Sequence, residues 1–269
     1  MVYKMMRISE INQASKILFE HKLNKTGLNS LNDMKPSNIV DAYRIQDQLK
    51  IHYLTLKNNF CIGKKIGCTS KAAQAQMNVN EPFYGNLFNK YSAKNINKLN
   101  SKYFFEPFVE PEISFRIKED VDISKAPYSI YNIKDLLDGI LCSIEIVDFR
   151  FQKPLADIGA INLISTNGAS DYWIYNDKIF NIDDINLSDF EVSLFIDDKL
   201  QEKGNTKNVL DNPLNAVLWL INTLCKKGET MLKHQYISSG SCTKAYRLNT
   251  GTRIKADFGK LGLIEFEYI

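Results

Sequence analysis

The sequence contains no long apolar run and little imbalance of charge. No stretch approaches the roughly 18 consecutive apolar residues that a membrane-spanning helix needs. The first ten residues, MVYKMMRISE, lack the apolar segment of a signal peptide. The net charge of +3 over 269 residues gives no reason to expect nucleic acid or an acidic membrane surface as a partner. We therefore expect a soluble, cytoplasmic protein.

Cysteine, histidine and glycine-rich motifs are also scarce. The five cysteines form an odd set without any CxxC spacing, which argues against a disulfide framework and against a zinc site. Only three histidines occur, His21, His52 and His234, and none lies in the context of a catalytic triad. Neither GxGxxG nor GxxxxGK[ST] is present, which removes the usual signatures of nucleotide binding.

The order of apolar patterns along the chain predicts an α+β fold. Helical spacing at 8–23 and 38–57, the second capped by Ser37, makes residues 1–60 a helical N-terminal region, and residues 61–269 follow as a β-rich domain. Within that domain the patterns predict a strand and turn at 60–70, a short helix at 71–79, a turn from Pro82 to Gly85, helices at 131–140 and 212–228 (capped by Asn212), and strands at 104–117, 140–151, 173–175, 190–197, 235–239, 253–257 and 262–269.

Two glutamates lie two positions apart in FVEPEISF, residues 108–115. Residues i and i+2 of a strand share a face, so Glu110 and Glu112 should point the same way. Glu145, in the apolar stretch CSIEIVDF, is a third carboxylate that would need a partner if buried. Three glutamates without histidine suit a hard divalent cation such as Mg²⁺ or Mn²⁺. An ExE pair alone is more often two solvated residues, but Pro111 indicates an edge or bulged strand, and bulges are common beside active sites.

Two further carboxylates and a lysine pair lie close to these segments. Glu106 could share the face of the ExE pair and is a weaker ligand candidate, whereas Asp148 should point away from it. Lys65 lies in the glycine-flanked run GKKIGCTS, and a desolvated lysine near a metal would have a lowered pKa and could transfer protons. Taken alone, a surface lysine is the simpler interpretation. Strand alternation puts Lys64 and Lys65 on opposite faces, so we expect that one could be buried and the other solvated.

Five segments, taken in order, carry a resemblance to a known family. They are GKKIGCTSKAAQAQMNVNEPFYGNLF, VEPEISF, SIEIVDFR, NPLNAVLWLINTL and ISSGSCTKAYRLNTGTRIKADFGKLG. Together they resemble the 2-keto-4-pentenoate (2-hydroxypentadienoate) hydratase family, which includes the related 4-oxalocrotonate decarboxylases. The resemblance runs from about residue 38 to the C-terminus. It implies a fumarylacetoacetate-hydrolase-like fold, in which a helical N-terminal region precedes a mixed β-sandwich or roll with external helices, and it implies a homo-oligomer.

The resemblance also implies roles for individual residues of a metal-binding catalytic domain. Glu110, Glu112 and Glu145 would hold Mg²⁺ or Mn²⁺, and Lys65 would be the catalytic or substrate-orienting residue. The substrate, a 2-oxo or 2-hydroxydienoic acid, would lie among Thr69, Ser70, Phe83, Asn167, Ser241 and Thr243. The implied reaction is a hydratase step of aromatic catabolism, which adds water to a 2-hydroxy-2,4-dienoate to give a 4-hydroxy-2-oxo acid. The alternatives are decarboxylation of a 4-oxalocrotonate-like 2-oxo acid and a divergent paralogue without standard hydratase turnover.

Several positions depart from the family pattern. Hydratases of the family usually carry an acidic residue in an EPDYG-type turn, where this sequence reads EPFYG and has Phe83. Glu81 could replace it only if the turn presents that side chain inward. In VDFR, Phe149 occupies the position where the family pattern has a small residue. In ISTN, Thr166 occupies the position of the family's aspartate, whereas Asn167 matches the family pattern. An acylpyruvate hydrolase, the other main chemistry of this fold, commonly needs a histidine base and is less expected.

Overall fold

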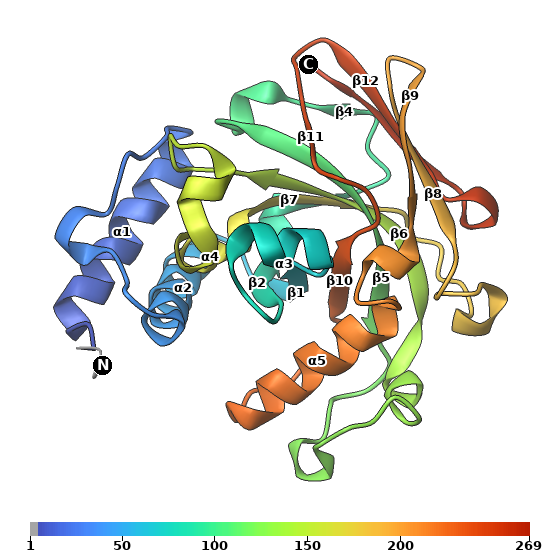
Figure 1. Ribbon diagram of the computed structural model, residues 1–269, viewed down its shortest axis with the longest axis horizontal. Helices are drawn as coiled ribbons and strands as arrows, with labels where there is room; N and C mark the ends of the chain where they lie inside the picture. The colour runs from blue at the N-terminus through green and yellow to red at the C-terminus, as the bar shows by residue number, and fades with distance from the viewer. Residues whose placement is uncertain (1–4) are drawn as a thin grey trace.

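Two β-sheets organise the chain, for which the computed structural model describes residues 5–269 apart from the side chain of Ala156 (Figure 1). The eight-stranded sheet runs in the order β2-β1-β10-β5-β6-β7-β3, with β11 paired to β5, and the five-stranded sheet runs β4-β13-β12-β8-β9. The strands are β1 Cys61–Gly67, β2 Phe83–Phe88, β3 Ser92–Lys94, β4 Lys98–Leu99, β5 Pro107–Ile117, β6 Leu137–Asp148, β7 Ser170–Tyr175, β8 Glu191–Ile196, β9 Lys199–Asn205, β10 Tyr236–Ser241, β11 Tyr246–Arg247, β12 Thr252–Asp257 and β13 Leu263–Tyr268. Residues 1–4 of the predicted helical region lie outside the described residues.

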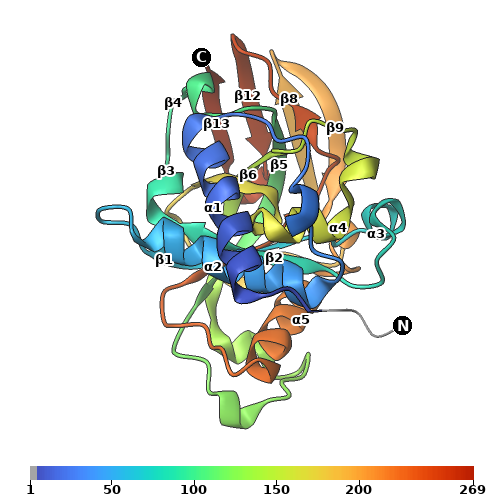
Figure 2. The same cartoon turned by 90° about the vertical axis from the view of Figure 1, so that its left-hand side faces the viewer.

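Five α-helices pack around these sheets. They are α1 Ile8–Asn24, α2 Ile39–Leu54, α3 Lys71–Met77, α4 Leu155–Ser165 and α5 Pro213–Lys226. Helix α1 packs on α2 and α2 on α4, and Figure 2 shows α1 and α2 in front of the large sheet. Helix α5 packs against β10. Among the described residues, no helix combines the length and apolarity needed to cross a bilayer.

The buried apolar side chains form two main clusters. One lies between the two sheets and α5 and includes Phe115, Phe266 and Leu220. The other lies between the N-terminal helices and the large sheet and includes Ile45 and Phe88. The second cluster joins residues from both sides of residue 60, so burial of the face of α2 helps to place the strands that follow it. The predicted division into regions 1–60 and 61–269 stays a prediction.

Helix caps follow the chemistry of short polar side chains, with one shift of position. Asn212 caps α5 as predicted, because its Oδ1 accepts the backbone N–H of Leu214 at 2.9 Å. The cap of α2 is Asn38, not the predicted Ser37, since Asn38 Oδ1 accepts the N–H of Asp41 at 2.8 Å. This helix begins one residue later than the sequence pattern indicates.

Two local predictions are wrong, and glycine explains both. The predicted helix at 131–140 is a 3₁₀ turn, Ile133–Leu136, followed directly by β6. Gly139 has φ of +152°, and a Cβ there would lie 2.4 Å from the Phe180 carbonyl oxygen, so the chain continues as a strand. Gly85 does not mark a turn but lies inside β2, where a Cβ would lie 2.2 Å from the carbonyl oxygen of Asn167.

Candidate active site

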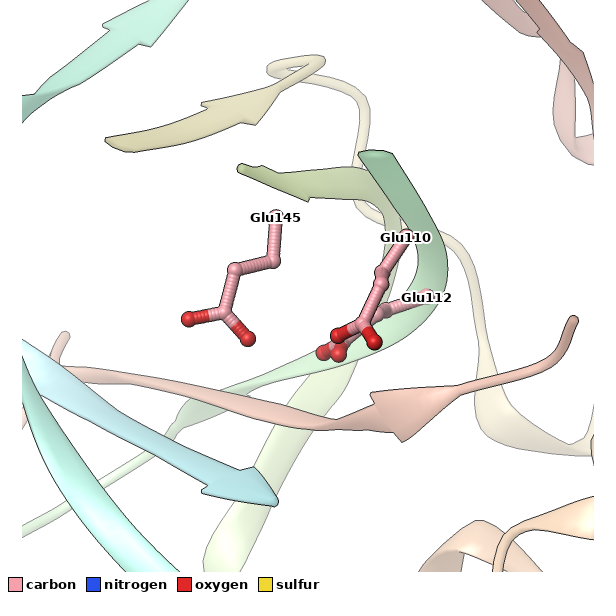
Figure 3. A group of neighbouring side chains, drawn as sticks. All are labelled: Glu110, Glu112 and Glu145. Atoms are coloured by element: carbon pink, nitrogen blue, oxygen red, sulfur yellow. The ribbon is translucent and has the colours of Figure 1, made fainter. Parts of the chain in front are cut away.

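Three glutamate side chains converge where β5 meets β6. In the antiparallel pair β5–β6, Glu110 lies directly opposite Glu145, and Glu112 is two residues further along β5 on the same face. One oxygen from each carboxylate lies within 4.8 Å of the others. Figure 3 shows Glu110 and Glu112 pointing together from one strand, with Glu145 facing them from its neighbour. The predicted group of three carboxylates is thus brought together, although its role as a metal site stays a prediction.

The strand that carries the ExE pair is central in the sheet, not an edge. Its partner β10 is bulged, because the register shifts between Ser238 and Ser241. This bulge lies opposite the segment from Glu112 to Ser114. Pro111 lies just beyond it, where β10 has ended at Ser241, and its carbonyl oxygen accepts the N–H of Cys242 at 2.9 Å. A residue that has no N–H to donate is therefore placed outside the β5–β10 ladder.

Burial and mutual repulsion act on the three carboxylates. Burial, reinforced by Glu145, raises the pKa of Glu110 to about 7 even though Lys65 opposes the shift. Burial and the two other glutamates hold the pKa of Glu112 well above its usual range. Oε1 of Glu112 and both carboxylate oxygens of Glu145 are buried without a hydrogen-bond donor of good geometry. Oxygens left in this way match the all-oxygen donor set that Mg²⁺ or Mn²⁺ takes, so the residues present fit a hard divalent cation.

Lys65 completes the charge balance of the site. It comes from β1, and its Nζ lies 3.1 Å from Oε2 of Glu145. Burial would lower the pKa of Lys65, but the three glutamates outweigh burial and raise it above its usual value. The expectation of a lowered pKa concerns a lysine beside a bound metal, so it stays a prediction. Lys64 is buried as well, with its Nζ 2.8 Å from Oδ1 of Asn86, so neither lysine is solvated.

A chain of hydroxyl groups supports Glu112, and the sequence patterns did not indicate it. Ser238 of β10 donates a hydrogen bond to Oε2 of Glu112, and the N–H of Gly240 donates to the same oxygen at 3.1 Å. Ser238 in turn accepts from the indole N–H of Trp173 at 3.1 Å and from Ser114 at 3.1 Å. These contacts fix the orientation of Glu112 and leave its other oxygen free for a ligand. Only the pairing of β10 with β5 brings the donors to this carboxylate.

A cleft of about 520 Å³ opens on one side of the carboxylates. Its lining includes Glu110 together with four of the predicted substrate-binding residues, Thr69, Ser70, Ser241 and Thr243. Gly240 is required here: its φ is +117°, and a Cβ would lie 2.3 Å from Oγ1 of Thr69. The oxygen of Ser70 caps α3 through the N–H of Ala73.

Two predicted substrate-binding residues lie behind this lining. The ring of Phe83 packs close to Gly67, and the Nζ of Lys65 lies 6.0 Å from its centroid. Asn167 uses its amide to tie the chain to β2: its Oδ1 accepts the N–H of Asn86 at 2.7 Å, and its Nδ2 donates to the Asn86 carbonyl at 2.9 Å. Contact of either residue with a substrate stays a prediction.

The remaining candidates lie away from the three carboxylates. Glu106 pairs with Arg247 at 3.0 Å, and Glu81 is exposed and accepts from the indole of Trp219 at 3.3 Å. Glu81 is therefore not turned inward as a replacement acid. The ring of Phe149 packs on Phe108. Thr166 caps the end of α4, where its hydroxyl donates to backbone carbonyls.

A second buried charge cluster lies on the opposite face of β6, as predicted for Asp148. Arg150 is paired with Asp148 at 2.9 Å and also with Asp171, which in turn is paired with Lys22 of α1. Burial alone would raise the pKa of Asp171, but Lys22 and Arg150 lower it. This cluster joins α1 to β7 and is internally balanced, which indicates a structural role.

Comparison with known proteins agrees with the resemblance seen in the sequence. No family model matches the chain. It is 26% identical over 243 residues to a 4-oxalocrotonate decarboxylase of Pseudomonas putida, covering 88% of each chain. It is 27% identical over 243 residues to a 2-oxo-hept-4-ene-1,7-dioate hydratase of Escherichia coli, covering 86% of this chain and 87% of the other. It is 25% identical over 259 residues to a 2-keto-4-pentenoate hydratase of Paraburkholderia xenovorans, covering 95% and 94%.

Solved structures show the same fold. The 4-oxalocrotonate decarboxylase of Pseudomonas putida G7, solved with magnesium and adipate, superimposes with a TM-score of 0.92 at 23% identity, covering 99% of this chain and 100% of that one. Fumarylpyruvate hydrolase of Pseudomonas aeruginosa, solved with Mn²⁺ and pyruvate, has a TM-score of 0.58 at 9% identity, covering 77% and 88%. The resemblance to the hydratase and decarboxylase family is confirmed.

Proposed function

We propose that this relative of the 2-keto-4-pentenoate hydratases and 4-oxalocrotonate decarboxylases is a divalent-metal-dependent lyase that acts on a short, unsaturated 2-oxo acid. The observation that carries the proposal is the group of Glu110, Glu112 and Glu145: it holds buried oxygens without a hydrogen-bond donor, Lys65 lies beside it, and Glu110 borders a cleft. The three glutamates would hold Mg²⁺ or Mn²⁺. When bound, the cation would supply a Lewis acid that stabilises negative charge on the 2-oxygen of the substrate.

The residues of the chain then have separate tasks. Lys65 is buried beside the carboxylates, with its Nζ 3.1 Å from Oε2 of Glu145. Its ammonium group can donate a hydrogen bond to the substrate and hold the proton that the product carbon needs. Thr69 and Ser241 line the cleft and offer hydroxyl groups to the substrate's polar atoms. The narrow approach of Gly240 to Thr69 keeps that wall in place.

Between the two candidate reactions, the surroundings of Lys65 favour decarboxylation over the hydration that we expect first from the sequence. Phe83 places an aromatic ring next to Lys65 where hydratases usually carry an acid, and Glu81 is turned away. Decarboxylation needs no group that activates water. The C–C bond to the leaving carboxylate breaks, CO₂ departs, the electron pair enters the conjugated oxo acid, and one proton returns to carbon. Hydration remains the second candidate, because hydratases are as similar to the chain as decarboxylases are, at 25–27% identity.

The test supplies both substrates to one preparation. Metal-free protein receives Mg²⁺ or Mn²⁺ and then 4-oxalocrotonate, with CO₂ measured, or 2-hydroxypenta-2,4-dienoate, with diene absorbance measured. We expect metal-dependent CO₂ release that Glu112→Gln abolishes and Glu106→Gln leaves intact. Diene loss without CO₂ would assign the hydratase reaction instead. Absence of both reactions would favour a divergent paralogue without turnover.

Three other expectations stay predictions. They are assembly into a homo-oligomer, a role in aromatic catabolism, and the description of the two sheets as a β-sandwich or roll of the fumarylacetoacetate-hydrolase type.

A further inference from the structure

The ring of Phe83 fills a slot between two glycines beside Lys65. A Cβ on Gly67 would lie 2.7 Å from Cε2 of Phe83, and a Cβ on Gly168 would lie 3.5 Å from the same atom. The same two Cβ positions face Lys65, whose Nζ lies 3.3 Å from the first and whose Cδ lies 3.5 Å from the second. Because glycine has no side chain, the phenyl ring is the group that fills the space between the two backbones.

This slot adjoins both the three carboxylates and the cleft beside them. The Nζ of Lys65 lies 3.1 Å from Oε2 of Glu145, and Glu145 lies opposite Glu110 in the β5–β6 pair. Gly67 and Glu110 both line the cleft of about 520 Å³. One side of the Phe83 ring therefore faces the candidate active site.

A second, larger cavity borders Phe83. Its volume is about 890 Å³, within the usual range of small-molecule sites, and it lies between α2, α4 and α5. Phe83 lines it together with Val40 and Tyr43 of α2, Ile164 of α4 and Trp219 of α5. Among the described residues, the cavity and the first cleft share no lining residue. Phe83 thus separates an active-site cleft from a cavity whose walls are largely apolar.

We propose that Phe83 sets the upper limit of substrate chain length: its ring closes the passage from the active site into the second cavity and so excludes 2-oxo acids with a long apolar tail. The inference rests on the proposed function, which places the 2-oxo acid group at the three glutamates. A tail that extends from there past Lys65 meets the phenyl ring in the slot between the two glycines. A smaller side chain in place of Phe83 would open the slot and let the tail enter an apolar cavity that is already present.

The first cleft gives a long tail no equivalent place. Its lining includes the hydroxyl groups of Thr69 and Ser241 and the charged side chains of Glu202 and Lys244. Burying an alkyl chain against these groups would take water from them without replacing its hydrogen bonds. The added methylene groups of a long substrate should therefore stay largely in water while Phe83 is present.

A matched pair of saturated acids tests this limit by binding alone. 2-Oxopentanoate and 2-oxooctanoate differ only in the length of the alkyl chain, and their binding to Mg²⁺-loaded protein can be measured by calorimetry. Burial of one methylene group raises affinity roughly fourfold, so the longer acid can gain at most about 60-fold. We expect wild type to bind the two acids within about threefold of each other, and Phe83→Ala to raise the ratio of the two affinities by about tenfold or more.

Further variants separate the passage from general loosening of the structure. Trp219→Ala enlarges the second cavity from its α5 wall but leaves the ring of Phe83 in the slot, so the ratio should stay as in wild type. Thr223→Phe fills the cavity from the same helix and, combined with Phe83→Ala, should cancel the gain. Phe83→Leu and Phe83→Val remove less volume, disturb folding less, and should give intermediate ratios.

The outcomes distinguish this inference from the proposed function. A wild type that already binds the longer acid about tenfold more tightly would overturn the inference alone. An unchanged ratio in the folded Phe83 variants would do the same, as would a gain that Thr223→Phe leaves intact. If neither acid binds in a Mg²⁺-dependent way, the proposed function fails and the inference fails with it.

Discussion

Replacing Glu112 by glutamine should have opposite effects on the metal-free and metal-loaded protein. Glu112 is fully buried, and its Oε1 has no partner. One oxygen of each glutamate in the group lies within 4.8 Å of the others. Two negative charges at that distance repel by about 3.5 kcal/mol at an effective dielectric constant of about 20. Proton uptake relieves part of that cost, because burial already holds the pKa of Glu112 well above its usual range. We therefore expect metal-free Glu112→Gln to be about 1–2 kcal/mol more stable than wild type.

Metal should reverse this order. At a metal concentration of 100 times Kd, binding stabilises wild type by about 2.7 kcal/mol. Loss of a residue that only orients a metal ligand can weaken metal binding by roughly 100-fold. Loss of a direct ligand such as Glu112 should weaken it by at least as much. At the same metal concentration the variant then gains only about 0.4 kcal/mol. For a chain of this size these gains correspond to increases in Tm of roughly 5–10 °C and about 1 °C.

The assay is thermal or urea unfolding in EDTA and in Mg²⁺ or Mn²⁺. Glu106→Gln is the control, because Glu106 lies on the same segment but pairs with Arg247 outside the carboxylate group. It should show the full wild-type response to metal. A Glu112→Gln protein that is less stable without metal and equally stabilised by it would refute the reasoning, since Glu112 would then be a structural hydrogen-bond acceptor only.

Three further changes probe other parts of the molecule. Lys65→Met should lower turnover in steady-state assays by about 10²- to 10⁴-fold, as loss of a proton-transfer group does. The control Lys64→Met should change turnover by less than tenfold. Equal losses in the two variants would show that both act through a shared structural effect. Phe83→Asp should shift the products toward the 4-hydroxy-2-oxo acid, as measured by NMR of the reaction mixture. An unchanged product ratio would show that Phe83 does not determine the choice between decarboxylation and hydration. Asp171→Asn should lower the free energy of unfolding near pH 7 by about 3–5 kcal/mol, because it leaves buried Lys22 unpaired. The pKa of Asp171 is depressed in the folded protein, so the contribution of its ionised form to the free energy of unfolding is fully present above the unfolded pKa of about 4. That contribution is lost as pH falls through the folded pKa. If urea unfolding below pH 4 gave a constant difference in free energy of unfolding between wild type and variant, this expectation would be contradicted.

Local patterns were sufficient for elements with a clear period or cap. The face shared by Glu110 and Glu112 follows from strand alternation, and α5 follows from Asn212, Pro213 and the apolar run behind them. Helix α4 was missed because Leu155–Ser165 is apolar on nearly every side and shows no amphipathic period. Strand β9 was missed because its residues are mostly exposed and polar.

The sequence by itself determined which chemical groups the protein has for catalysis: three glutamates on strand-forming segments, two adjacent lysines between glycines, and no histidine in the segments that carry them. Residue type and short-range periodicity are properties of the chain, so they can be read without a fold. Tertiary structure alone decided that Glu145 lies opposite Glu110, that Ser238 holds Glu112, and that Thr69 and Ser241 line one cleft with Glu110. Those relations depend on the register of strands far apart in sequence, and register is set by packing of the whole core.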